Sequence, residues 1–367
     1  MISIEGDYLE GGGQIIRTAL AMSALTGKAF EAADIRKARS NPGIKAQHLH
    51  CIKALEQLCD ATTEGAELGS TRLKFIPGSF RAKNLEIDIG TAGSISLLLQ
   101  SLLVPLMFSG KKCKLTLTGG TSGKWQMPFD YFINVFAPHL RKFARIDAKL
   151  LRRGYYPKGG GKVELRIDPK SSMTGTSDPG KLIQEIREYV KPIDLAEQGE
   201  LLQIKGISHA STKLENANVA ERQAREAANM LKARFDCPVN VQTEYADTYS
   251  PGSGITLWAI FAKSGEDVDF LDPVIIGSDA IGERGKPAEK VGRDAAQELA
   301  EEINSKAAAD QHLEDNIIPF LALAGGRIKV AKLTDHTRTN MYIVEKFLGG
   351  LFDIDEQEKI IQVKREK

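Results

Sequence analysis

The chain has 367 residues, a length that favours two domains or one large repeated domain over a single domain of ordinary size. Lys and Arg number 49 against 48 Asp and Glu, and the resulting net charge of +1 excludes a globally basic protein that coats nucleic acid. The 4 cysteines form no CxxC or CxxxC pair, which excludes a zinc ribbon and a thioredoxin-like redox motif.

Short strands, glycine-containing loops and helices follow one another in a recurring order. The first block begins with an apolar strand at residues 2–4 and a helix at 14–25, where apolar residues recur near the helical period. A helix at 43–58 and a strand at 72–76 complete it. The second block repeats this order with strands at 85–89, 113–118 and 163–167 and helices at 94–107 and 128–143.

A third block occupies the C-terminal part of the chain. It contains strands at 274–276, 327–331 and 360–363 and helices at 287–303, 313–323 and 340–348. A strand–helix–strand–helix unit that occurs about three times predicts a repeat architecture.

An irregular stretch separates the second block from the third. Residues 168–181 are rich in Ser, Thr, Pro and Gly and are typical of a linker. Residues 184–272 then combine strands and a helix and are predicted to form a small inserted α+β domain. The large repeated domain would comprise residues 1–183 and 273–367.

Two glycine-rich segments could bind an anion. Residues 152–162 contain a run of three glycines and four cations, a composition that suits either a polyanion-binding backbone or a tight, solvated hairpin. Glu10 precedes three glycines and Arg17 at the start of a helix, which indicates either an anion site with a metal-binding carboxylate or simple turn chemistry. Residues 119–124 lack the pattern of a true phosphate-binding P-loop.

The histidines form no HxxxH or HExxH pair, which argues against zinc hydrolase chemistry. His336 is predicted to lie in a polar loop after a strand and before a helix, where a lone histidine is more often solvated than catalytic. His312 opens a predicted helix, where capping is its simplest role.

Taken together, these segments resemble the RNA 3′-terminal phosphate cyclase family. Five motifs occur in the family's order, namely EGGGQIIR at 10–17, NPG with QHL at 41–49, EGAELGS at 64–70, RGYYPKGGG at 153–161, and LAG with HTRTN at 323–340. The resemblance implies an α+β fold with a large domain of three βαβαββ-type repeats, related to the enolpyruvyl transferases, and a small inserted domain. The insert predicted at 184–272 agrees with this expectation.

The resemblance also implies an ATP-dependent enzyme of the ligase class. Such enzymes convert an RNA 3′-terminal phosphate into a 2′,3′-cyclic phosphate and release AMP and pyrophosphate. In the family a histidine attacks the α-phosphorus of ATP and carries AMP covalently, and the RNA 3′ end is adenylated next. By motif match this histidine is His336.

Further roles are implied by position. The resemblance assigns nucleotide contacts to Gln100 and to the run His312, Leu313, Glu314, Asp315 and Asn316, in which Asn316 stands where the family has glutamine. It places Arg17, Arg39 and Gln47 around phosphates. It makes Glu10 a ligand of a divalent metal, Mg²⁺ or Mn²⁺.

Three other functions remain open at this point. A non-catalytic cyclase-like protein that binds RNA and assists ribosome assembly would lack the nucleophilic histidine, which this chain has at His336. An enolpyruvyl-transferase-like enzyme or a plain RNA-binding module are the others. The N-terminal residues show no secretory pattern and no stretch suits a membrane span, so we expect a cytoplasmic protein with no membrane association and no obligate protein partner.

Overall fold

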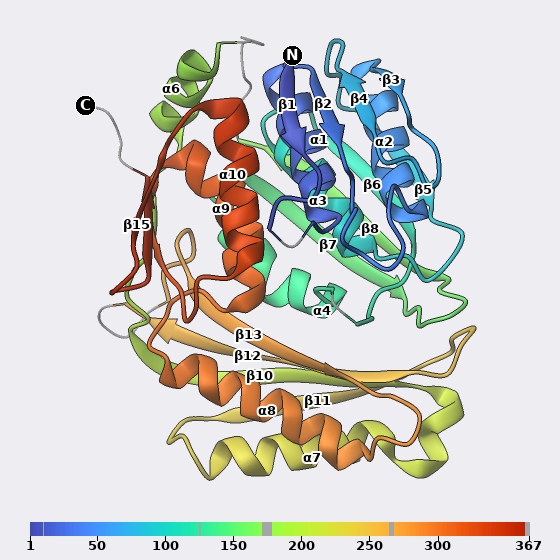
Figure 1. The fold of residues 1–367 in the computed structure, drawn as a ribbon. Helices are drawn as coiled ribbons and strands as arrows, with labels where there is room; N and C mark the ends of the chain where they lie inside the picture. Colours follow the sequence, from blue (N-terminus) through green and yellow to red (C-terminus); the bar gives the residue numbers. More distant parts are fainter. Residues whose placement is uncertain (10, 125, 171–177, 264–267, 364–367) are drawn as a thin grey trace.

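The computed structural model describes residues 1–9, 11–124, 126–170, 178–263 and 268–363 (Figure 1). Within these ranges the strands form four four-stranded sheets with helices packed against them, which confirms a mixed α+β architecture. None of the described helices combines the length and the apolar character that a membrane crossing requires.

The first sheet is built from the N-terminal block. Its order is β1 (Ile2–Glu5), β2 (Phe30–Ala33), β4 (Leu73–Ile76) and β3 (Thr62–Glu64). The pair β1 and β2 is parallel, and the other two pairs are antiparallel. Helices α1 (Gln14–Thr26) and α2 (Ala46–Cys59) connect its strands.

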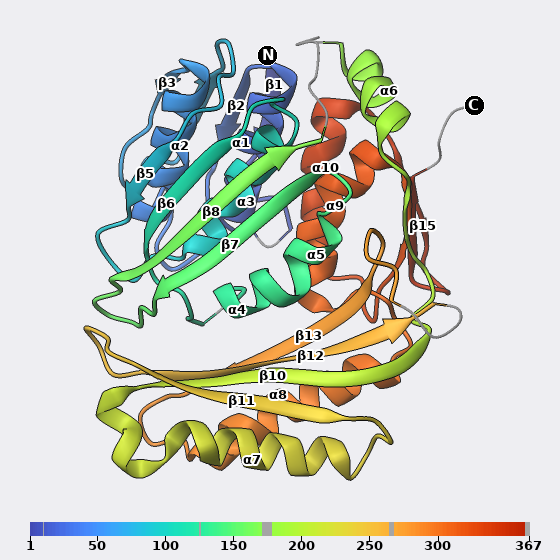
Figure 2. The ribbon, with the colours of Figure 1, turned by 180° about the vertical axis from the view of Figure 1, so that it is seen from behind.

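Two further sheets repeat this topology strand for strand. The second has the order β5 (Leu85–Asp88), β6 (Cys113–Gly119), β8 (Gly161–Pro169) and β7 (Ala144–Arg152), and Figure 2 shows it face on. The third has the order β9 (Ile193–Leu195), β14 (Gly326–Lys329), β16 (Ile360–Val363) and β15 (Phe352–Asp355). In both, the first pair is parallel and the others antiparallel, as the predicted repeat architecture requires. The relation to the enolpyruvyl transferases stays a prediction.

Helices from all three repeats pack together at the centre of these sheets (Figures 1 and 2). The second repeat supplies α3 (Ile95–Met107) and a composite helix of α4 (Phe129–Tyr131), a π-helical turn (Phe132–Phe136) and α5 (Ala137–His139). The third supplies α9 (Gln311–Ala324) and α10 (Asp335–Leu348), with α6 (Pro179–Tyr189) packed beside them. Their apolar faces form the core, so the starts of α1, α9 and α10 are held in fixed relation.

The fourth sheet forms a separate layer below the repeats in Figure 1. Its order is β11 (Val239–Ala246), β10 (Glu200–Ser211), β12 (Ser253–Ala262) and β13 (Val274–Ile281). Helices α7 (Val219–Lys232) and α8 (Ala288–Asn304) cover one face, and the other face is turned toward the repeats (Figure 2). We call this sheet with its two helices the small part, and the three repeats the large part.

Two strands pair differently from the sequence-based prediction. Strand β13, expected to begin the third block, pairs with β12 in the small part, and β9, expected inside the insert, pairs with β14 in the third repeat. The apolar start of β13 is buried on both faces, so its pattern does not reveal which sheet it joins, and β9 has only 3 residues. As a division into domains, the boundaries at 184 and 272 stay a prediction.

Candidate functional site

Helix α10 begins at Asp335 rather than at residue 340, where the sequence predicted it. Thr334 is its N-cap, and the Thr334 hydroxyl accepts a hydrogen bond from the backbone N–H of Thr337 at 3.1 Å. His336 therefore lies in the first turn of a helix and not in the preceding loop.

The ring of His336 is held by Gln14, in the first turn of α1. Nδ1 of His336 forms a hydrogen bond with Oε1 of Gln14. Since an amide oxygen only accepts, Nδ1 carries the proton, and in the neutral ring the lone pair lies on Nε2. Gln14 thus orients the His336 ring and leaves the Nε2 lone pair available. Gln14 was part of a quoted motif but had no predicted role.

A chain of side-chain hydrogen bonds joins α1, α3 and α9 beside this pair. Arg17 Nε donates to Gln100 Oε1 at 2.7 Å, and Gln100 Nε2 donates to Asn316 Oδ1 at 2.9 Å. Asn316 Nδ2 in turn donates to the carbonyl of His312 at 2.6 Å. Four residues that were selected from the sequence are therefore brought together.

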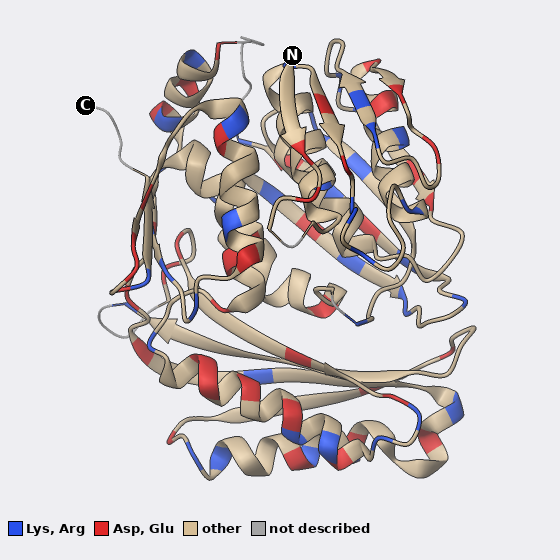
Figure 3. Ribbon diagram, in the orientation of Figure 1, with Lys and Arg blue, Asp and Glu red and all other residues tan. Residues whose placement is uncertain are grey.

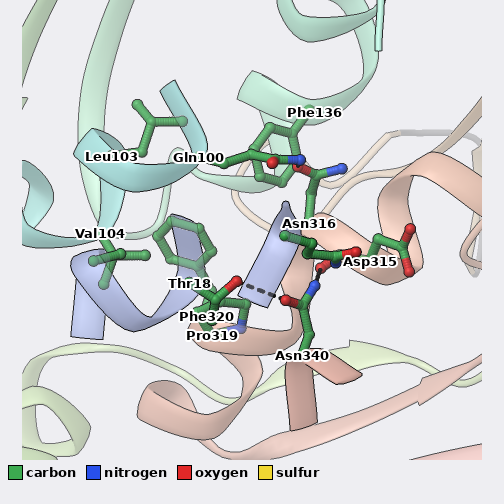
Figure 4. A pocket seen from close by; sticks show the side chains of 12 residues that line it. Thr18, Gln100, Leu103, Val104, Phe136, Asp315, Asn316, Pro319, Phe320 and Asn340 are labelled. Carbon is green, nitrogen blue, oxygen red and sulfur yellow. Dashed lines mark hydrogen bonds between the residues drawn. The ribbon is translucent and has the colours of Figure 1, made fainter. Parts of the chain in front are cut away.

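Two cavities adjoin these residues. A narrow one of about 20 Å³ is lined by Gln14, Gln100 and Asn316 among others, and Figure 4 shows the side chains of Asn316 and Asn340 on one side of it and Leu103 and Val104 on the other. A wider hollow of about 380 Å³ is lined in part by Gln311, Thr334 and His336. His336 thus borders the space that is large enough to admit a ligand.

Asp310 anchors the first turn of α9. Its carboxyl group accepts from the backbone N–H groups of His312 and Leu313 at 2.9 and 3.0 Å. It also accepts from the Tyr131 hydroxyl at 2.6 Å and from the backbone N–H of Gly277, on β13, at 2.6 Å. Asp310 is 1% exposed, so a single buried carboxyl group ties the second repeat, the third repeat and the small part together.

His312 faces the small part. Its Nε2 lies 2.8 Å from Oδ1 of Asp279, on β13, and its ring makes an edge contact with Tyr131 at a centroid distance of 5.1 Å. Burial lowers the pKa of His312, but the hydrogen bond and charge of Asp279, with the charge of Asp310, outweigh it and raise the pKa to about 9. His312 is therefore a cation at neutral pH.

The contact between His312 and Asp279 predicts a pH dependence of stability. The folded-state pKa of about 9 exceeds the ordinary histidine value of 6.5, so the stabilisation is complete below pH 6.5 and is lost as the pH rises through 9. We expect Asp279→Asn to remove roughly 2–3 kcal/mol at pH 6 and little at pH 10, measured by denaturant unfolding. Asp294→Asn, on an exposed part of α8, is the control, and equal losses at both pH values would contradict the prediction.

The rest of the run after His312 divides between core and site. Leu313 and Glu314 are 0% and 1% exposed, and Glu314 accepts from the Thr337 hydroxyl at 2.8 Å. Burial, with the charge of Asp315, raises the pKa of Glu314 to about 8. Burial also raises the pKa of Asp315 to about 6, against the charge of His336, which lowers it. Leu313 thus packs the helices, whereas Glu314 lines the wider hollow and Asp315 lines the narrow cavity.

Arginine side chains and one histidine N–H group surround the glycine loop at the start of α1. A Cβ at Gly13 would overlap Nε2 of His48, and one at Gly12 would lie 3.6 Å from Nη2 of Arg39. Arg17 is 8% exposed, and burial lowers its pKa to about 10, which leaves it charged at neutral pH.

His48 contributes a neutral donor to this loop. The backbone N–H of Lys45 donates to Nδ1 of His48 at 3.1 Å, so Nε2 carries the proton. Burial, with the charges of Arg17 and Arg36, lowers the pKa of His48 to about 3. His48 stood in the quoted QHL motif without a role. Gln47 precedes it in α2, and no described hydrogen bond joins the side chain of Gln47 to this cluster.

The predicted metal ligand, Glu10, lies outside the described residues. Across the ranges that the structure describes, no three or more His, Cys, Asp and Glu side chains gather so as to hold a metal ion. The divalent metal therefore stays a prediction from the sequence.

The glycine-rich segment 152–162 forms the tip of the β7–β8 hairpin. Arg153 is 2% exposed and forms ion pairs with Asp130 at 2.6 Å and with Glu244, on β11, at 2.8 Å. A Cβ at Gly154 would overlap the backbone of Gly161 on the opposing strand. The side chain of Arg153 thus joins the two parts of the molecule. For this residue the structure agrees with the interpretation of the segment as a tight hairpin rather than as an anion-binding backbone.

Comparisons with known proteins agree on one family. A family model described as RNA 3′-terminal phosphate cyclase matches residues 8–354. The chain is 44% identical over 355 residues to the RNA 3′-terminal phosphate cyclase of Pyrococcus furiosus, covering 96% of this chain and 95% of that protein. It is 41% identical to the cyclase of Methanopyrus kandleri over 369 residues, with 98% and 96% covered. The cyclase of Pyrobaculum aerophilum is 41% identical over 360 residues, with 97% and 95% covered.

Proposed function

Because the chain belongs to the RNA 3′-terminal phosphate cyclase family, we propose that it uses ATP to convert an RNA 3′-terminal phosphate into a 2′,3′-cyclic phosphate. The observation that carries the proposal is the hydrogen bond between Gln14 and His336, which orients a ring nitrogen beside the wider hollow. A non-catalytic cyclase-like protein would need no such nucleophile.

His336 begins the proposed reaction. Its Nε2 attacks the α-phosphorus of ATP, a nitrogen–phosphorus bond forms, and the bond to pyrophosphate breaks. An oxygen of the RNA 3′-phosphate then attacks the same phosphorus, and the bonding electrons return to Nε2. Finally the 2′-oxygen attacks the terminal phosphorus, its proton passes to solvent, and AMP leaves. Gln14 keeps the proton on Nδ1 throughout, so the same nitrogen can act in each cycle.

The cluster at the start of α1 fits a polyphosphate. Arg17, Arg39 and the Nε2–H of His48 surround a helix N-terminus that has no side-chain cap, and backbone donors there favour an anion. His312, Gln100 and Asn316 would hold the nucleoside. A divalent metal, if bound, would neutralise phosphate charge, and the cytoplasmic location and absence of an obligate partner also remain proposals.

The proposal is tested by comparing RNAs that differ in the chemistry of their 3′ ends. RNA with a 3′-phosphate is expected to be cyclised in an ATP-dependent manner, and RNA with a 3′-hydroxyl is expected to be inert because it has no phosphate to activate. An RNA with a terminal 2′-deoxy, 3′-phosphate nucleotide should stop as an adenylated end, because the closing nucleophile is missing. Gel separation of labelled products distinguishes these cases, and a cyclic product without ATP would contradict the scheme.

Arg17→Ala is expected to slow covalent AMP uptake about 10- to 150-fold, because a charge-assisted contact contributes about 1.5–3 kcal/mol. The melting temperature should change little. Arg293→Ala, which removes an exposed ion pair on α8, is the matched control and should retain full activity. An Arg17→Ala protein with wild-type rates would remove Arg17 from the phosphate site.

A further inference from the structure

Two exposed tyrosines and three cations gather where the β7–β8 hairpin meets the loop between β11 and β12. We call Arg152, Tyr156, Lys158, Lys213 and Tyr249 the tyrosine–cation surface. The side chains of Tyr156 and Tyr249 are 81% and 55% exposed, among the most exposed of the large apolar side chains.

Specific contacts join the three segments that supply this surface. The Arg152 guanidinium lies 4.8 Å from the centroid of the Tyr249 ring. Lys213 Nζ donates to the carbonyl of Tyr249 at 3.5 Å, and the backbone N–H of Lys158 donates to the Ser250 hydroxyl at 3.1 Å. The surface is therefore a defined arrangement and not a chance grouping along the sequence.

The backbone beneath the surface is rigidly supported. The ion pairs of the buried Arg153 side chain fix the hairpin to both parts of the molecule, and the Tyr155 hydroxyl lies 2.7 Å from Nδ1 of His209. The ring of Tyr249 lies against Gly160, where a Cβ would overlap it. A surface fixed in this way loses little conformational entropy when it binds a ligand.

The named residues of the surface are positively charged. They include three cations and no carboxylate, and the nearest acidic residues along the chain are Glu215 and Asp247, each two residues away. Among the described residues, no ion pair connects Arg152, Lys158 or Lys213 to an acidic side chain, and Figure 3 shows Lys and Arg near the hairpin tip. Unpaired cations beside exposed rings are the combination that binds single-stranded nucleic acid.

The small-part sheet connects this surface to the nucleotide side of the site. The hairpin contacts His209, which pairs with Gly254 on β12. Two residues along β12, Thr256 pairs with Asp279, the partner of His312. That step is about 7 Å along a strand, and neighbouring strands lie about 4.8 Å apart. Strand β12 therefore runs from the part of the sheet that contacts the hairpin to the part that contacts His312, and an RNA chain that follows this strand away from the site would reach the surface.

We propose that the tyrosine–cation surface binds the single-stranded RNA segment that precedes the 3′-terminal phosphate, with Tyr156 stacking on a base and the cations contacting backbone phosphates. The proposal rests on the proposed function, because it concerns the RNA of that reaction. In this proposal the exposed side chains of the β7–β8 hairpin contact the RNA, and the glycines of the hairpin have a structural role.

The test separates RNA binding from chemistry. Covalent AMP uptake from ATP needs no RNA and should be unchanged in Tyr156→Ala and Lys158→Ala. With a 3′-phosphorylated oligoribonucleotide the KM should rise about 5- to 150-fold in Tyr156→Ala, the range that corresponds to the loss of one stacked base. With a dinucleotide that ends in a 3′-phosphate the KM should not change. Tyr156→Phe should restore the wild-type KM because it keeps the ring.

A control variant and the salt dependence of RNA binding complete the experiment. Tyr189→Ala removes a tyrosine that is 73% exposed on α6 and should leave every KM unchanged. Lys158→Ala should weaken the salt dependence of oligoribonucleotide binding, measured by fluorescence anisotropy. Wild-type affinity of Tyr156→Ala for the oligoribonucleotide, or an equal loss on the dinucleotide, would overturn the proposal. Failure of the proposed function would instead appear as a wild-type protein that takes up no AMP, and anisotropy still tests the surface in that case.

Discussion

His336→Ala is expected to abolish covalent AMP uptake and to reduce cyclisation by at least about a thousandfold, because the proposed nucleophile is removed. Intact-mass measurement after incubation with ATP should show AMP on the wild-type protein and none on the variant. The linkage should be labile in acid and stable in base, as a phosphoramidate is. His50→Ala is the matched control, since this partly exposed ring contacts only the carbonyl of Ala46 at 2.8 Å among the described residues.

A second variant tests the orientation of the His336 ring. Gln14→Ala should keep the nucleophile but lose the hydrogen bond that fixes its tautomer, so AMP uptake should slow about 10- to 150-fold without disappearing.

If the His336→Ala protein still became labelled, another residue would have to carry AMP, and the assignment of His336 would be wrong.

Arg153→Ala is expected to destabilise the protein by about 3–5 kcal/mol, the usual loss when one partner of a buried ion pair is removed. Burial lowers the pKa of Arg153, but the charges and hydrogen bonds of Asp130 and Glu244 outweigh it, so the guanidinium stays charged. Its removal would leave the Asp130 carboxylate, 3% exposed, without its main partner. Denaturant unfolding measures the loss.

The neighbouring arginine provides the control. Arg152→Ala removes an exposed side chain and should cost less than about 1 kcal/mol. The double variant Arg153→Ala with Asp130→Ala should be more stable than the sum of the single losses predicts, because neither charge is then left unpaired. A free energy of unfolding unchanged in Arg153→Ala would show that these ion pairs do not stabilise the fold.

Helices with a clear apolar period were predictable from the sequence, and short or charged strands were not. The helices predicted at 14–25 and 94–107 match α1 and α3, and the strand at 360–363 matches β16. Strand β7 was missed because a helix was extended to residue 143, directly before it, and because charged residues occupy its exposed face. Whether such a segment forms a strand depends on its packing against neighbouring strands, and the local sequence pattern does not contain that information.

For the site, too, residues in local motifs were predictable from the sequence, and residues that act through contacts with distant elements were not. Arg17, Gln100 and Asn316 were found because each lies in or near a recognisable motif, and the structure joins them by hydrogen bonds. Asp279 and Asp310 were not found, because their importance comes from partners in other elements. Sequence spacing carries no record of such contacts.

The position of Asp310 has a consequence for how the molecule can move. Hinge opening between the small part and α9 would have to break the buried hydrogen bond from Gly277 to Asp310, together with the contact between Asp279 and His312. Breaking buried bonds of this kind costs several kcal/mol, so such opening is rare. In the proposed reaction, entry of ATP and exit of products would therefore depend on local motions of loops and side chains rather than on separation of the small part from α9.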